Sequence, residues 1–216
     1  MGEIQFRGVK IQHLSHAAFK LEGAGVAVYI DPFSVPAAPS DGDIGICTHE
    51  HYDHCSTDDL RKVLKPDAVI VAAANCEKKL RGLKREVKLL KPGEEARVKG
   101  VKILAVPAYN VNKPYHPRGY GGIGVVVEIS GVRVYHAGDT DLIPEMEQLR
   151  GAVDVALLPV SGTYVMTAEE AAEAVRRIKP SVAIPMHYGA IVGSASDAER
   201  FRKLVEGICE VATGCA

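Results

Sequence analysis

The chain has 216 residues, of which 47% are hydrophobic, so it can bury a sizeable core and is expected to form one domain over residues 1–216. A formal net charge of −1 and a pI near 6.7 predict no electrostatic surface for nucleic acid or anionic lipid. No apolar run approaches the ~20 residues of a membrane span, and the N-terminal residues lack the apolar core of a signal peptide. The five cysteines show no metal-type pair spacing. We therefore expect a reduced, cytoplasmic protein with no membrane partner. The sequence does not decide between a monomer and a homo-oligomer.

Short apolar runs rich in β-branched residues alternate with helical patterns along the chain. Many of these runs are continuous enough to be strands buried on both faces. In chain order the expected elements are strand 25–30, strand 43–48, a helix from Ser56 to Leu64, strands 67–73, 101–108, 122–129, 132–137 and 154–160, a helix over 167–179, strand 182–186 and a helix over 196–207. The basic run 78–85 is interpreted as a solvated helix face, and Gly131 as a hairpin turn. This order predicts an α/β protein with sheet inside and helices outside.

The segment THEHYDHCS, residues 48–56, carries three histidines and two acids in the six positions from His49 to His54. Because side chains two residues apart on an extended chain point the same way, His49 and His51 can converge on one ion. Asp53 and His54 follow a turn and can converge on a second ion. Imidazole and carboxylate are ligands that zinc prefers, and they also suit manganese, iron or nickel. The alternative, a polar loop that caps a helix, would explain one histidine but not three.

This segment resembles the H-x-H-x-D-H signature of the metallo-β-lactamase-fold superfamily. Three other stretches resemble motifs of that family in the same order: YIDPF, which contains Asp31, YHAGDTD, which contains Asp139, and IPMHYG, which contains His187. The similarity spans roughly residues 16 to 190 and is closest to a branch of small, stand-alone, lactonase-like metal-dependent hydrolases. The resemblance implies a four-layer αββα sandwich with its metal site along one edge, between the two sheets.

The resemblance also implies one or two divalent metal ions per chain, with zinc favoured over manganese, iron or nickel. Water between two ions would lose a proton near neutral pH and attack the carbon or phosphorus of an ester, lactone or phosphodiester. Asp53 would serve as a catalytic residue that orients this nucleophile as well as a ligand. The implied ligands are His49 and His51 for the first ion, Asp53, His54 and His187 for the second, and Asp139 as a bridge between them.

One position departs from the family pattern. The family places a third histidine for the first ion between the signature and the G-D-T motif, in many members directly after a Pro-Ala-x triplet. In this chain the stretch PAYNVNKPYHPRG has Asn110 at that place, and a histidine only at His116. We favour His116 because imidazole is much the better ligand for these metals. The alternatives are that Asn110 contributes a weak oxygen ligand, or that both residues line a substrate loop and the first site is weak.

The roles of four further residues do not follow from the ligand pattern alone. Asp31 is expected to accept a proton from a ligand imidazole and so fix its tautomer. His16, in the stretch SHAAF, could lie behind the ligands, face the substrate or belong to a core turn. His136 is expected to pack beneath the site, whereas His13 has no motif and is expected on the surface.

The loop 109–122, rich in Tyr, Asn, Lys, Pro and Gly, is expected to form a wall of the substrate site. Lys113 and Arg118 could meet an anionic substrate there or be ordinary solvated charges. Tyr164 could face the same cleft, and Cys55 is interpreted as a bystander rather than a soft ligand.

Together these features predict a metal-dependent hydrolase that acts on a small molecule. Two alternatives stay open: an iron-binding redox enzyme of the same fold and a non-catalytic metal-binding protein. No flavodoxin-like domain or rubredoxin-type cysteine set follows the motifs, which disfavours the first alternative. A nucleic-acid substrate is not expected, because the sequence shows neither a basic patch nor an added RNA-binding arm.

Overall fold

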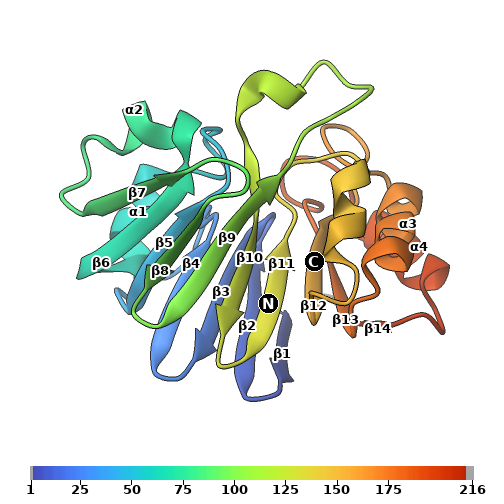
Figure 1. Cartoon of the computed structure of the whole chain (residues 1–216), viewed down its shortest axis with the longest axis horizontal. Helices are drawn as coiled ribbons and strands as arrows, with labels where there is room; N and C mark the ends of the chain where they lie inside the picture. Colours follow the sequence, from blue (N-terminus) through green and yellow to red (C-terminus); the bar gives the residue numbers. More distant parts are fainter. Residues whose placement is uncertain (1, 213–216) are drawn as a thin grey trace.

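Two seven-stranded sheets form the centre of the molecule (Figure 1). The structure, a computed structural model, describes residues 2–212. The first sheet contains, in spatial order, β1 (Gly2–Phe6), β2 (Val9–Ser15), β3 (Ala18–Gly23), β4 (Val26–Ile30), β5 (Gly42–Cys47), β6 (Leu64–Ala73) and β7 (Glu86–Leu90). The second sheet runs in the reverse spatial order, from β14 to β8, and contains β8 (Glu95–Val98), β9 (Val101–Pro107), β10 (Ile123–Ile129), β11 (Val132–His136), β12 (Val155–Pro159), β13 (Val182–Met186) and β14 (Glu210–Val211).

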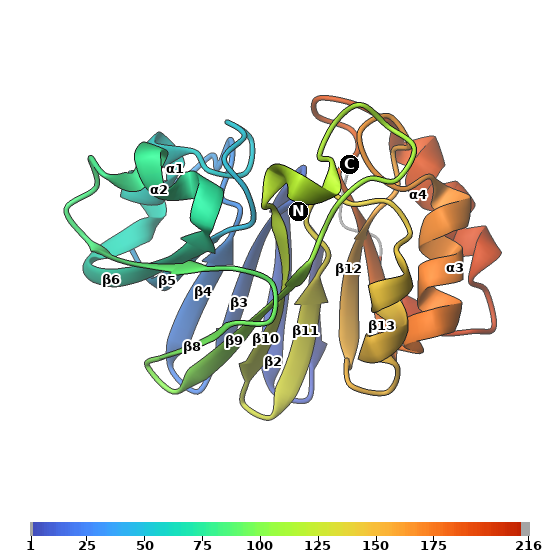
Figure 2. The same cartoon turned by 45° about the horizontal axis from the view of Figure 1, so that its top comes forward.

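The helices lie outside the two sheets. Figures 1 and 2 show α1 (Thr57–Val63) and α2 (Glu77–Leu80) beside β5 to β7, and α3 (Ala168–Ile178) and α4 (Ala195–Leu204) beside β12 and β13 on the other side of the molecule. Short 3₁₀ turns cover Ala74–Cys76, Arg118–Tyr120 and Pro144–Leu149. This arrangement confirms the four-layer αββα sandwich. No helix within residues 2–212 is both long and apolar enough to cross a bilayer.

Each sheet is antiparallel in one half and parallel in the other. Strands β1 to β4 and β8 to β11 are antiparallel, whereas β4 to β7 and β11 to β14 are parallel. Helices α1, α3 and α4 lie in the crossovers between parallel strands, as such connections require. The carboxyl ends of the parallel strands therefore meet at one edge of the sandwich, where α/β proteins place their sites.

Burial along the strands explains the apolar runs in the sequence. Strands β5, β12 and β13 are buried at every position, because sheet and helix cover both of their faces. Close packing adds a requirement for glycine at one place: a Cβ atom at Gly45 would lie 2.8 Å from Leu64 Cδ1 and 3.0 Å from Leu60 Cδ2. Helix α1 and the start of β6 can thus approach β5 closely.

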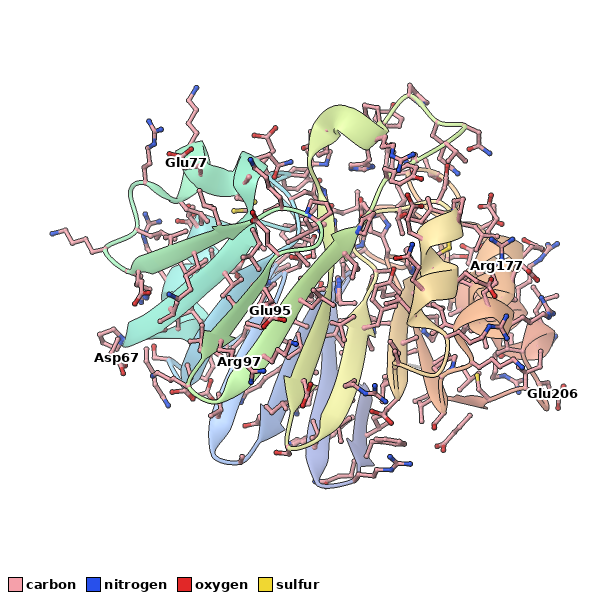
Figure 3. All side chains as sticks on the ribbon, viewed as in Figure 1. Asp67, Glu77, Glu95, Arg97, Arg177 and Glu206 are labelled. Atoms are coloured by element: carbon pink, nitrogen blue, oxygen red, sulfur yellow. The ribbon has the colours of Figure 1, made fainter. Side chains whose placement is uncertain are left out.

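An ion-pair cluster joins the two sheets away from that edge. Lys99, in the turn between β8 and β9, lies 3.1 Å from the carboxylate of Asp43 on β5 and 3.1 Å from that of Asp67 on β6. Lys65 approaches the same Asp43 oxygen at 2.9 Å. Figure 3 shows Asp67 at the periphery of the molecule, where water screens its charge, whereas Asp43 is buried. Asp43 is therefore the centre of this cluster.

The expected strands from 25–30 to 182–186 are present, but the sequence analysis missed β1, β2, β3, β7, β8 and β14. In β2 (VKIQHLS) and β9 (VKILAVP) buried and half-buried positions alternate, which is the pattern of a sheet with one solvated face. The polar residues of β2 and β3 interrupted the apolar runs on which the strand predictions rested. Short edge strands such as β8 and β14 carry too few residues to show a period.

Two helix predictions need correction. The helix expected over 78–85 is a single turn that ends at Leu80. Gly82 disfavours helix at this point. The Arg85 side chain donates to the carbonyls of Leu64 and Lys65 as the chain turns toward β7. The last helix begins at Ala195 rather than at Ser196, and its capping box is formed by Ser194 with Asp197.

Candidate metal centre

The polar motifs come together at the edge of the sandwich where the parallel strands end. Asp31 follows β4, the segment 48–55 follows β5, Asp139 follows β11 and His187 follows β13. The loop between β9 and β10 arches over this edge in Figures 1 and 2 and carries His116. Both sheets therefore supply side chains to one site.

Three histidines form the first cluster. His51 Nδ1 lies 3.0 Å from His49 Nε2 and 3.0 Å from His116 Nε2, and one ring nitrogen from each histidine lies within 4.8 Å of the others. Ligand nitrogens around a tetrahedral zinc ion are roughly 3.3 Å apart, given zinc–nitrogen bonds of about 2.0–2.1 Å. The three nitrogens are thus spaced for one ion.

A second cluster lies beside the first and contains His16, Asp53, His54 and His187, again with one ligand atom from each within 4.8 Å of the others. Asp53 Oδ2 is 3.3 Å from His16 Nε2 and 3.5 Å from His54 Nε2. The sequence analysis left the role of His16 open. The structure places its ring among the atoms of this cluster rather than behind them.

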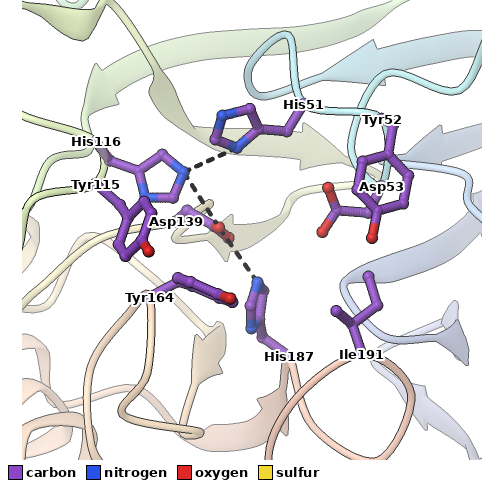
Figure 4. A pocket seen from close by; sticks show the side chains of 9 residues that line it. All are labelled: His51, Tyr52, Asp53, Tyr115, His116, Asp139, Tyr164, His187 and Ile191. Atoms are coloured by element: carbon purple, nitrogen blue, oxygen red, sulfur yellow. Dashed lines mark hydrogen bonds and ion pairs between the residues drawn. The ribbon is translucent and has the colours of Figure 1, made fainter.

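Asp139 lies between the two clusters. Its carboxylate is 3.2 Å from His187 Nε2 and 3.5 Å from His116 Nε2 (Figure 4). It is also 3.2 Å from His54 Nε2. The preceding residue, Gly138, has φ = +64°, and a Cβ atom there would lie 2.7 Å from the carbonyl oxygen of Ile123. The G-D-T motif therefore needs this glycine to bring Asp139 into the site.

Several buried atoms of the clusters have no hydrogen-bond partner. They are both ring nitrogens of His16, His54 Nε2 and Asp139 Oδ1. Buried polar atoms in native proteins are nearly always partnered, so these atoms need a common explanation. A divalent cation would satisfy imidazole nitrogens and carboxylate oxygens at once. The residues that are present therefore fit a metal ion.

The pKa shifts of the site reflect its charges. Burial acts to raise the pKa of Asp139, but the imidazoles of His187 and His54 outweigh it and hold the pKa well below its usual range. Burial acts to lower the pKa of His54, but the carboxylates of Asp139 and Asp31 outweigh it and raise the pKa to about 10. For His49, burial and the neighbouring His54 hold the pKa well below its usual range. The carboxylates thus favour positive charge in the site, and His49 keeps the neutral ring that a metal ligand needs.

Asp31 lies directly behind His54. Its Oδ2 atom is 2.7 Å from His54 Nδ1, and its two oxygens also accept hydrogen bonds from the backbone and the hydroxyl of Thr48 at 2.8 and 2.6 Å. The carboxylate accepts a hydrogen bond from the N–H at Nδ1, so Nε2 is the nitrogen from which a bound ion would displace the second proton of His54. Asp31 therefore lies in the position from which it can fix the tautomer of the His54 ring.

Asn110 and His116 occupy different places in the loop. The Asn110 amide donates to the carbonyls of Tyr115 at 3.0 Å and Tyr164 at 2.7 Å, and its backbone N–H donates to the carbonyl of His116 at 2.8 Å. Asn110 belongs to neither cluster. The structure brings His116 to the first cluster and uses Asn110 to shape the loop that carries it.

Two histidines outside the clusters hold the backbone around them. His13, expected on the surface, is instead buried: its ring stacks on Phe19 with centroids 4.6 Å apart and donates to the carbonyl of His16 at 2.8 Å. Because β2 was not recognised, its inward-facing position could not be predicted. His136 packs beneath the site, as expected, and donates to the carbonyl of Ala17 at 2.8 Å. Cys55 is buried and belongs to none of the candidate ligand groups found within residues 2–212.

A cavity of about 270 Å³ opens over the two clusters (Figure 4). Tyr164 faces it, as expected, whereas Lys113 and Arg118 do not line it. The loop 109–122 contributes Tyr115 and His116 to the wall, as expected. The sequence analysis missed Tyr52 and Ile191, because only a position beside a motif histidine or on a late loop marks them. The lining residues are His51, Tyr52, Asp53, Tyr115, His116, Asp139, Tyr164, His187 and Ile191.

Comparisons with known proteins agree with this geometry. Residues 10–187 match the model of the beta-lactamase superfamily domain. A UPF0173 metal-dependent hydrolase of Thermococcus onnurineus is 37% identical over 216 residues, which cover 94% of this chain and 95% of the relative. Among solved structures, a putative metal-dependent hydrolase from Parabacteroides distasonis has a TM-score of 0.86 at 32% identity and covers 99% of this chain and 98% of its own. A metallo hydrolase from Ignicoccus hospitalis has a TM-score of 0.80 at 28% identity, with 95% and 94% covered. The chain therefore belongs to the beta-lactamase superfamily and has the metallo-β-lactamase fold.

Proposed function

We propose that this chain is a hydrolase that holds two divalent ions, most naturally zinc, and uses water to cleave an ester, lactone or phosphodiester of a small molecule. The observation that carries this proposal is the position of Asp139, whose carboxylate lies within 3.5 Å of His116 in the first cluster and of His54 and His187 in the second. A carboxylate shared by two imidazole clusters at such distances is the arrangement of a bridged two-metal site.

The ligand sets follow from the two clusters. When bound, divalent ions there supply a water that ionises near neutral pH and polarise the attacked oxygen. The first ion would be held by His49, His51 and His116, the second by Asp53, His54 and His187 with His16 beside them in the same cluster, and Asp139 would contact both.

Asp53 is placed to handle a proton. It lines the cavity, and its side chain keeps 12% of its surface exposed. Burial acts to raise the pKa of Asp53, but the neighbouring imidazoles of His16 and His54 outweigh it, so the pKa is lowered and the group is ionised at neutral pH. Asp53 can therefore orient a water molecule and accept its proton, then return that proton to the leaving oxygen.

The test combines metal analysis with a substrate panel. The purified protein should contain up to two ions per chain and should turn over at least one ester, lactone or phosphodiester. Asp139→Ala should lose bound metal and all turnover, whereas Asp67→Ala, which removes an exposed carboxylate far from the site, should change neither. Full metal content and full turnover in Asp139→Ala would contradict the proposal. A metal-loaded protein with no turnover on the whole panel would favour the non-catalytic alternative.

A further inference from the structure

Several large apolar side chains that line the cavity over the clusters are exposed to solvent. Of the five large hydrophobic side chains that are exposed within residues 2–212, three line this cavity: Tyr52 at 60%, Tyr115 at 47% and Ile191 at 38%. Exposed apolar side chains gathered at one concave site mark a binding surface, whereas scattered ones need no explanation. The part of the substrate that does not react should therefore be apolar.

The aromatic side chains stand on two sides of the opening. Figure 4 shows Tyr115 and Tyr164 on one side and Tyr52 with Ile191 on the other. The rings of Tyr115 and Tyr164 are perpendicular, with centroids 4.8 Å apart, and the ring of Tyr52 meets Phe33 edge-on at 5.7 Å. These contacts limit the freedom of the walls, so a flat ring can enter between surfaces that are already ordered.

The volume agrees with a substrate of modest size. The cavity measures about 270 Å³. An engineered protein cavity of about 150 Å³ accommodates benzene. The space over the clusters is therefore large enough for one ring and an attached ester group, and too small for a long polymer segment to be enclosed.

Among residues 2–212, no lysine or arginine lines the cavity. The two cations of the neighbouring loop are already engaged, since Lys113 pairs with the buried Asp141 and Arg118 lies 2.8 Å from Glu145. The carboxylates of Asp53 and Asp139 face the same space and offset part of the charge of any ions bound there. An anionic substituent away from the reacting atom would lose water without gaining a side-chain partner, which is costly. A transferred phosphoryl group would have only the ions, and no side-chain cation, to hold its oxygens.

We infer that the substrate is an uncharged carboxylic ester or lactone that carries an aryl or branched-alkyl group, an inference that rests on the hydrolase function proposed above. In the reaction, the oxygen of water bonds to the carbonyl carbon and the carbon–oxygen bond to the leaving group breaks. One proton of the water passes to the leaving oxygen. An ester gives a carboxylic acid and an alcohol or phenol, and a lactone gives a single hydroxy acid. The apolar group lies between Tyr115 and Ile191 while the carbonyl faces the two clusters.

A matched pair of esters tests the charge preference. The metal-loaded protein would be assayed with 4-carbamoylphenyl acetate and 4-carboxyphenyl acetate, which have similar size and reactivity but differ in charge. Each kcat/KM would be divided by the rate constant for hydroxide. We expect at least a tenfold preference for the neutral ester, and a lower normalised rate for bis(4-nitrophenyl) phosphate than for either ester. An equal or faster rate for the carboxylate ester or for the phosphodiester would overturn the inference.

Variants of the wall sharpen this test. Ile191→Lys should reduce the preference for the neutral ester by tenfold or more, because it places a cation at the mouth of the cavity. Ile208→Lys is the matched control, since Ile208 is 45% exposed but does not line the cavity, and it should leave the preference unchanged. Tyr115→Ala should raise KM for the neutral aryl ester several-fold with little change in kcat and in metal content.

A binding measurement separates failure of this inference from failure of the proposed function. N-Phenylacetamide, an amide analogue of the ester, should bind the metal-loaded protein in calorimetry, and several-fold more weakly to Tyr115→Ala. Binding without turnover of any ester would reject the hydrolase function while leaving the apolar cavity established. Turnover that prefers the anionic ester would reject the substrate class and leave the hydrolase function standing. Equal binding of the amide to both proteins would show that the aromatic wall does not contact the substrate.

Discussion

Oδ2 of Asp31 lies 2.7 Å from Nδ1 of His54, and neither side chain is exposed. Asp31 directly follows β4, and His54 lies in the segment after the neighbouring parallel strand β5, so the pairing of these strands brings the two residues to the same edge. Asp31 also accepts two hydrogen bonds from Thr48, which leaves its carboxylate little freedom to turn away. The orientation of one candidate ligand is thus fixed by residues outside the cavity.

Asp31→Asn should weaken binding of the second ion by roughly 10- to 100-fold, the usual effect of losing a hydrogen-bond partner behind a ligand histidine. An amide can accept from His54 only by turning its NH₂ group toward the N–H of Thr48, so one contact must be lost. Metal affinity measured by competition with a chelator checks this. Asp41→Asn, which neutralises an acid paired with Lys20 on the surface, is the control and should leave affinity unchanged. Equal affinities for the two variants would contradict the role assigned to Asp31.

His116→Ala should weaken the first ion's binding by a large factor, and Asn110→Ala should weaken it much less. The reason is that His116 Nε2 lies 3.0 Å from His51 Nδ1, whereas the Asn110 amide is engaged with the carbonyls of Tyr115 and Tyr164. Metal stoichiometry and affinity of both variants would be compared with those of the unchanged protein. The opposite ranking would make Asn110 the ligand and His116 part of the cavity wall.

Removal of metal should lower the melting temperature, because an ion that binds only the folded state stabilises it by mass action. Free ion at about 100 times its Kd would contribute about 2.7 kcal/mol to the free energy of unfolding. Differential scanning calorimetry after chelation, and again after zinc or manganese is restored, measures this change. An unchanged melting curve after verified removal would mean that the ions do not link the two sheets.

Asp43→Asn should lower stability at neutral pH by roughly 1–2 kcal/mol, because Lys65 and Lys99 would each lose a charged partner. Burial acts to raise the pKa of Asp43, but Lys65 and the backbone N–H of Ala27 outweigh it and lower the pKa. A carboxyl group whose folded-state pKa is depressed stabilises the fold above its unfolded pKa of about 3.9, and this contribution disappears as pH falls through the lower folded value. Urea unfolding of both proteins should therefore show a difference that is full at pH 7 and shrinks below about pH 4. A difference that is the same at pH 7 and pH 3 would contradict the assignment to this carboxylate.

The sequence predicted the centre of the molecule better than its edges. Strands β5, β12 and β13 are buried on both faces, so their apolar runs were unmistakable, and the motif residues follow directly from their ends. Strand β2 has a solvated face, and its alternation of buried and half-buried residues was not recognised in the sequence. His13 was therefore expected on the surface, although it is buried. Most of the candidate metal ligands were found because the motifs that contain them resemble those of the family.

Tertiary packing decides the remaining features of the site. The sequence could not show that the turn between β2 and β3 carries His16 to Asp53, since 37 positions separate them along the chain. Nor could it show that Tyr52, Tyr115 and Ile191 share one cavity. Such contacts arise from the way the two sheets dock, and no local pattern records them.

The division of ligands between the sheets has a consequence for how the chain matures. His49, His51, Asp53 and His54 follow the first sheet, whereas Asp139 and His187 follow strands of the second, and the loop of His116 joins strands of the second. During synthesis the first half of the chain emerges with only part of each ligand set. On the ligand sets proposed above, a half-made chain would bind a metal ion only weakly, and tight binding would wait until the last strands had been added. Retained metal would then report that both sheets are complete.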